Sequence, residues 1–146
     1  MPNYQGVWSL STQYQNASAW PSPPATVGLF AGGLDGSNAA VNNIDQFNIV
    51  ILSNATDFGD LLATKQRNTG CSSATRGVFS AGLDGSTNAF LDVIEYVTIA
   101  STGNAVDFGD TTVGSTNGAG LSNDTYGLLA GGYGRISGSG TYKQNI

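Results

Sequence analysis

A repeat of about fifty residues is the feature of this sequence that most constrains its fold. The segment Gly28–Ser37, which reads GLFAGGLDGS, returns as Gly77–Ser86, and a shortened copy starts at Gly127, so the spacing is 49 and then 50 residues. Three further segment pairs keep this order and spacing: Asn54–Asp60 with Asn104–Asp110, Ile44–Ile49 with Ile94–Ile99, and Gly70–Arg76 with Gly120–Tyr126. The chain is therefore predicted to be an array of one repeated supersecondary unit.

Each repeat is predicted to contain four short strands. In the first repeat they cover Gly28–Gly33, Ile44–Val50, a segment that begins near Phe58, and Thr69–Ala74, with turn-rich stretches such as LDGSN between them. Four strands in forty to fifty residues are typical of a β-propeller blade. Small residues are expected where strands crowd near the propeller axis, namely Gly32, Gly33, Ala81 and Gly82.

Composition agrees with an all-β chain and excludes several classes of function. Charged residues make up 10% of the chain, Glu95 is its single glutamate, and glycine occurs 21 times. Five basic residues and a net charge of −5 cannot form the cationic surface that binds nucleic acid. The start of the sequence does not resemble a leader peptide, and no apolar run is long enough to predict membrane insertion.

Candidate chemistry is sparse. The chain has no histidine, which removes histidine-based catalysis and histidine-ligated metals, so no catalytic residue, metal or cofactor is predicted and the protein is expected not to be an enzyme. A pair of aspartates, Asp57 and Asp60, recurs one repeat later as Asp107 and Asp110. These residues are interpreted as turn formers, with glycosidase or calcium chemistry as the alternative. The Leu-Asp-Gly-Ser segments at Leu34 and Leu83 are interpreted as plain turns, and Cys71 as a packed cysteine.

The repeat resembles the kelch type. That family has an apolar strand that ends in Gly-Gly, then an aromatic residue on the second strand, then a tryptophan on the third. Here Phe47 or Tyr96 would be the aromatic residue, and Phe58 and Phe108 stand where the tryptophan is usual. The resemblance implies kelch-like propeller blades. It covers residues 28 to 133, and the second repeat departs from it by reading Ala81-Gly82.

A second resemblance concerns function. The opening Gly6–Gln15 (GVWSLSTQYQ), the following Trp20-Pro21, the Asn-Ala-x-Asp-Phe-Gly-Asp segments and the stretch Gly70–Gly77 are similar to propeller-type structural proteins of tailed marine bacteriophages. This implies a non-enzymatic virion protein, either a capsid decoration or a tail fibre or spike component, on the surface of the head or tail. Other virion proteins are then expected partners, and host-surface glycans are a further candidate.

The ends of the chain suggest a divided blade. If Trp8 corresponds to Phe58, residues 1–26 form an N-terminal half blade, 27–76 and 77–126 are complete blades, and 127–146 form a C-terminal half blade of one domain. Because three blades are too few to close a ring, a homodimer with a six-bladed ring is expected. A β-prism or a trimeric β-fibre is the structural alternative.

Four aromatic residues are the candidate ligand contacts: Trp8, Trp20, Tyr126 and Tyr133. Each is able to stack on a sugar or to pack in a core or an interface. Two other functions stay open beside the virion role. One is a lectin-like glycan-binding module, and the other is an enzyme on a propeller scaffold, which the missing histidines disfavour.

Overall fold

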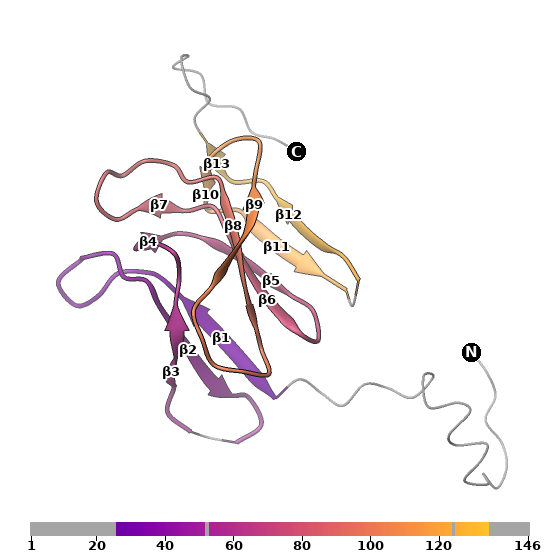
Figure 1. Ribbon diagram of the computed structural model, residues 1–146. Helices are drawn as coiled ribbons and strands as arrows, with labels where there is room; N and C mark the ends of the chain where they lie inside the picture. The colour runs from indigo at the N-terminus through magenta and orange to yellow at the C-terminus, as the bar shows by residue number, and fades with distance from the viewer. Residues whose placement is uncertain (1–25, 52, 124, 135–146) are drawn as a thin grey trace, which may run out of the picture.

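A computed structural model describes residues 26–51, 53–123 and 125–134 of the chain (Figure 1). In this part of the chain there are thirteen short strands and no helix, which confirms the predicted all-β class. All but one residue of the expected N-terminal half blade, and residues 135–146 of the C-terminal one, lie outside the described residues.

Three antiparallel sheets follow one another along the chain (Figure 1). The first sheet has the order β1-β2-β3, formed by Val27–Ala31, Asn43–Asn48 and Thr56–Asp60. The second has the order β5-β6-β8-β9, formed by Thr69–Ser72, Arg76–Ser80, Val93–Thr98 and Val106–Asp110. The third pairs β11 with β12, formed by Ala119–Ser122 and Gly127–Ala130.

Two very short strand pairs connect parts of successive repeats. They are β4 (Lys65–Gln66) with β7 (Leu83–Asp84), and β10 (Ser115–Thr116) with β13 (Tyr133–Gly134). None of the sheets among the described residues closes on itself.

The grouping of strands into sheets differs from the expected one. The fourth strand of the first repeat, β5, does not join β1–β3 but pairs with β6, the first strand of the next repeat. The reason is local, because only Ser73–Thr75 separate β5 from β6. The Ser73 N–H donates to the Arg76 carbonyl at 2.9 Å, and the Arg76 N–H donates to Ser73 Oγ at 3.1 Å. A tight hairpin therefore shifts each sheet by one strand relative to the sequence repeat.

The backbone hydrogen bonds repeat with the sequence. Leu61 N–H donates to the Asn42 carbonyl at 2.7 Å, and Thr111 N–H donates to the Asp92 carbonyl at the same distance. The bond from Gly33 N–H to the Lys65 carbonyl likewise has its counterpart one repeat later, from Gly82 N–H to the Ser115 carbonyl. The sequence repeat is thus also a structural repeat.

The Asp-Phe-Gly segments form β-bulges. In the pairing of β2 with β3, Ile44 lies opposite Gly59 and Asp45 opposite Asp57, so Phe58 is an extra residue; β8 and β9 repeat this around Phe108. Gly109 has a φ of 136°, which favours glycine at the bulge. At Gly59 an added Cβ would lie 2.4 Å from the Gly103 carbonyl oxygen.

The core lies between the first and second sheets. Its buried residues come from both: Ile44, Phe58, Leu61, Phe79, Val97 and Ala105. Backbone hydrogen bonds also join the two sheets, since Gly103 N–H donates to the Phe58 carbonyl and Ala105 N–H to the Asp60 carbonyl, both at 2.8 Å. The second and third sheets approach each other closely at Gly120, where a Cβ would lie 2.1 Å from the Gly70 carbonyl oxygen.

Corresponding phenylalanines differ sharply in exposure. Phe58 is 2% exposed, whereas Phe108, at the same place in the next repeat, is 61% exposed. Phe79 is 7% exposed, whereas its counterpart Phe30 is 67% exposed. Phe58 and Phe79 are buried where the first and second sheets face each other. The corresponding surfaces one repeat away, around Phe108 on β9 and Phe30 on β1, are therefore bare.

The small residue that follows the first strand of each repeat adopts a left-handed conformation. Gly32, Ala81 and Gly131 occupy one repeat position, with φ values of 68°, 62° and 69°. This conformation is what the three positions share, and in the second repeat alanine bears its strain.

Substitution by alanine should separate strain from steric clash at this position. We expect Gly131→Ala to lower the free energy of unfolding by at most about 1 kcal/mol, since only backbone strain is added and nothing lies within 4 Å of its Cβ. Gly32→Ala should cost at least about 2 kcal/mol, because its Cβ would lie 2.6 Å from the Lys65 carbonyl oxygen. Urea unfolding of both variants measures the difference, and equal losses would contradict this interpretation.

Candidate functional site

A buried ion pair joins the first two repeats. Lys65, on β4, and Glu95, on β8, are 1% and 0% exposed, and the Lys65 ammonium contacts Glu95 Oε1. The second carboxylate oxygen, Glu95 Oε2, accepts the Leu62 N–H at 2.7 Å. Both oxygens of the buried carboxylate are thus bound by groups of the preceding repeat, as a buried charge requires.

The ion pair is specific to one junction. At the corresponding positions of the neighbouring repeats the chain has Asp45 in place of glutamate and Ser115 in place of lysine. Among the described residues this is the one salt bridge. It is a structural contact, because both side chains are enclosed and their polar atoms are occupied.

The two Leu-Asp-Gly-Ser segments are turns, as predicted. Asp35 Oδ1 accepts the Ser37 and Ala39 N–H groups at 2.8 and 2.9 Å and the Ser37 hydroxyl at 2.7 Å. Asp84 Oδ1 binds Ser86 and Thr87 in the same way. These hydrogen bonds, led by the Ser37 hydroxyl at Asp35 and the Thr87 N–H at Asp84, lower the pKa of both carboxyls from 3.8.

The four repeated aspartates do not lie in turns, which corrects the sequence prediction. Asp57 and Asp60 belong to β3, and Asp107 and Asp110 belong to β9. The prediction was wrong because the Asp-Phe-Gly bulge has the composition of a turn but continues the strand. Asp107 does bind its own backbone, since its Oδ1 accepts the Gly109 N–H at 3.0 Å. Within the described ranges, no three potential metal ligands cluster.

Two of the four predicted aromatic contacts, Tyr126 and Tyr133, lie among the described residues. Tyr126 is 74% exposed at the β11–β12 turn. Tyr133 lies on β13, with its ring centroid 5.5 Å from that of Phe90. Trp8 and Trp20 lie outside the described residues. Cys71 is half-buried, and burial raises the pKa of its thiol.

An aromatic–arginine patch was missed by the sequence analysis. The Arg76 guanidinium lies 4.6 Å from the Tyr96 ring centroid, and the Tyr96 ring meets Phe108 edge to face at 6.0 Å. These residues come from β6, β8 and β9 of the second sheet. At the corresponding positions the first repeat has Val27, Gln46 and Phe58, so it shares only the phenylalanine. The substitution of Tyr96 and Arg76 at otherwise repeated positions was the available signal.

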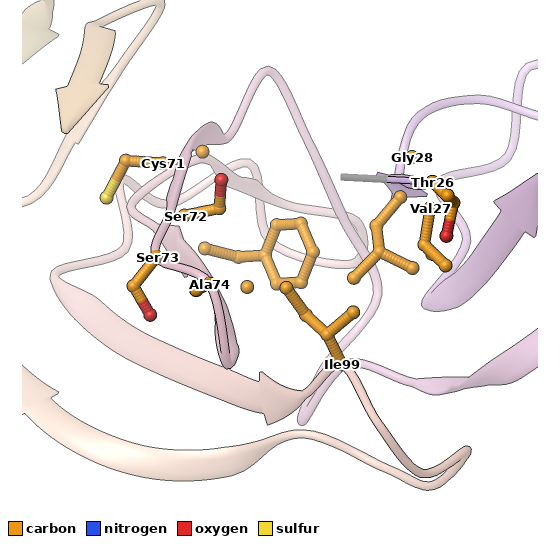
Figure 2. Close-up of a pocket in the computed structure, with 12 residues that line it drawn as sticks. Thr26, Val27, Gly28, Cys71, Ser72, Ser73, Ala74 and Ile99 are labelled. Atoms are coloured by element: carbon orange, nitrogen blue, oxygen red, sulfur yellow. The ribbon is translucent and has the colours of Figure 1, made fainter. Parts of the chain in front are cut away.

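A groove runs between β1 and β5, and we call it the β1–β5 groove (Figure 2). It encloses about 510 Å³. Figure 2 shows Thr26 and Val27 on one side and Ser72 and Ser73 on the other, with the Cys71 sulfur directed away from the groove. Glycine contributes to both walls, through Gly28 and Gly70, and the floor includes Phe79 and Ile99.

Neither a protein-family model nor a curated protein matches the chain. Among the described residues, no helix is long and apolar enough to cross a membrane.

Proposed function

We propose that this chain is a non-enzymatic structural protein of a bacteriophage virion, and that its sheets are kelch-like propeller blades that stack around an axis and associate with further copies. The observation that carries the proposal is the repeated sheet unit, whose contact surfaces are buried at one junction and bare at the described ends. Such a unit is suited to building a surface by repetition.

The contacts between the sheets support an architectural role. Phe58 and Phe79 meet in one core cluster, whereas their counterparts Phe108 and Phe30 are more than half exposed. Large exposed aromatic surfaces on a small protein are typical of interaction sites. Since the internal junction is formed by the same repeat positions, a homodimer with a six-bladed ring is the assembly that we propose. Other virion proteins are the proposed neighbours on the head or tail surface.

The assembly is tested by multi-angle light scattering during gel filtration. We expect a particle of twice the 14.9 kDa chain mass, and its dissociation by Phe108→Asp. Val50→Asp is the matched control, because Val50 is 66% exposed, as Phe108 nearly is, and belongs to no core position. A monomer at every concentration would contradict the six-bladed ring. Imaging of particles of a phage that encodes this chain tests the virion role. Absence of the protein from the purified particles would contradict that role.

A glycan-binding function is the second candidate, and the aromatic–arginine patch favours it. Tyr96 and Phe108 offer ring faces and edges to a sugar, and Arg76 offers donors to an acidic one. A glycan array would show binding that Tyr96→Ala abolishes and that Leu121→Ala, at an exposed residue outside the patch, preserves. An array without hits would remove this candidate and leave the structural role untouched.

A further inference from the structure

The apolar contacts between the first and second sheets do not by themselves determine which repeat lies against which. The core at this junction contains Phe58 and Phe79. The same two positions are phenylalanine again in the other repeat, as Phe108 and Phe30. Wrong pairing of similar units is a characteristic failure of repeat proteins. Selection of one junction therefore requires a contact that differs between the repeats.

The buried ion pair of Lys65 and Glu95 is such a contact. Both side chains are at most 1% exposed, and the ammonium contacts one oxygen of the carboxylate. The other carboxylate oxygen accepts the Leu62 N–H at 2.7 Å. That N–H belongs to the backbone, which both repeats have. The lysine ammonium is therefore the donor in this contact that depends on the sequence of the repeat.

A serine stands at the lysine position of the second repeat. The Ser115 N–H donates to the Leu91 carbonyl at 3.1 Å. The Lys65 N–H donates to the Val41 carbonyl at the same distance, so the two residues have equivalent places in the fold. If the second repeat of one copy stacked on the second repeat of another, Ser115 would meet Glu95. The carboxylate would then be buried without an ammonium, which is strongly unfavourable.

An aspartate stands at the glutamate position of the first repeat. Asp45 lies opposite Phe30 in the pairing of β1 with β2. Glu95 lies opposite Phe79 in the pairing of β6 with β8, so these two positions are equivalent as well. If the first repeat of one copy stacked on the first repeat of another, Lys65 would meet a carboxylate that is one methylene shorter. A buried ion pair is favourable only when its geometry is good, so this junction is also the poorer one.

We infer that the Lys65–Glu95 pair determines the order of the repeats, because it directs the second repeat onto the first and disfavours junctions between two copies of the same repeat. We expect the observed junction to be favoured at least about 100-fold over stacking of the second repeat on itself. This role is separate from stability, since an apolar pair would be about as stable but would fit every junction equally. The inference does not depend on the proposed function.

Refolding of the full chain from urea tests the selection. The double variant Lys65→Met with Glu95→Leu should keep a urea midpoint close to that of the unmodified chain. At high protein concentration it should nevertheless form at least about tenfold more high-mass, wrongly paired species, which gel filtration with light scattering measures. Leu61→Met is the matched control, because it is a change of similar volume in the same core, and it should refold like the unmodified chain.

A mixture of two single variants tests the same selection between copies. The Lys65→Met chain has a carboxylate without its ammonium, and the Glu95→Leu chain has the reverse defect, so each alone should unfold at a lower urea concentration than the unmodified chain. When they refold together, the remaining lysine of one chain is able to meet the remaining glutamate of the other, and the substituted positions form an apolar pair. We expect a complex of the two chains that unfolds at a higher urea concentration than either chain alone.

The inference is wrong if the mixture is no more stable than its components, because the pair would then not select its partner between copies. It is also wrong if the double variant keeps its midpoint and refolds without added high-mass species, which would leave the pair a purely structural role. Equal misassembly of Leu61→Met would assign the effect to any change in the core. Should the double variant fail to fold, the mixture still decides, since one of its junctions holds the original ion pair.

Discussion

Lys65→Met is expected to lower the free energy of unfolding by about 3 to 5 kcal/mol. The substitution leaves the Glu95 carboxylate fully buried with the Leu62 N–H as its remaining partner. A buried carboxylate without its counter-charge is strongly unfavourable, while the volume of the lysine stem is retained by methionine. Urea or guanidinium unfolding, monitored by near-ultraviolet circular dichroism, measures the loss.

Two controls show whether the loss comes from the unpaired charge. The double variant Lys65→Met with Glu95→Leu should recover most of the stability, because an apolar pair of similar volume often replaces a buried ion pair at little cost. Ser115→Ala, at the position of Lys65 in the next repeat, should change the free energy of unfolding by less than about 1 kcal/mol. If Lys65→Met also lowered the free energy of unfolding by less than about 1 kcal/mol, Glu95 would not be enclosed as described.

Phe58→Ala should also cost about 3 to 5 kcal/mol, whereas Phe108→Ala should cost less than about 1 kcal/mol in dilute solution. The two residues have the same neighbours in sequence and the same place in a β-bulge, but Phe58 is buried against the second sheet and Phe108 is largely exposed. The comparison therefore measures the contribution of one sheet packing on another at constant local structure.

Chemical unfolding at low and high protein concentration measures both variants. If the bare surfaces associate, the unmodified chain should become more stable with concentration, and Phe108→Ala should remove that dependence. Equal losses for Phe58→Ala and Phe108→Ala in dilute solution would contradict the exposures given by the structure.

The strand positions were accessible from sequence because they depend on local signals. The apolar segment before each Gly-Gly or Ala-Gly pair is β1, β6 or β12, and the segments around Phe47 and Tyr96 are β2 and β8. The Leu-Asp-Gly-Ser turns were likewise predicted, since an aspartate that binds the backbone two residues later needs no distant partner. These strands and turns could be predicted from the sequence repeat alone.

The bulges and the patch were less accessible. The aspartates of the Asp-Phe-Gly segments were interpreted as turn formers, although pairing with β2 and β8 keeps them in strands. The patch of Arg76, Tyr96 and Phe108 needs three strands in register, and register is a property of the whole sheet.

By itself the sequence determined the repeat, the all-β class and the places of the longer strands and of the Leu-Asp-Gly-Ser turns, because periodicity and turn residues act over a few positions. Only the tertiary structure decided that β5 joins the sheet of the next repeat, that Lys65 and Glu95 are buried together, and that Phe58 is enclosed while Phe108 is bare. These properties depend on which repeat lies against which, and identical sequence motifs have different surroundings at a junction and at an open end.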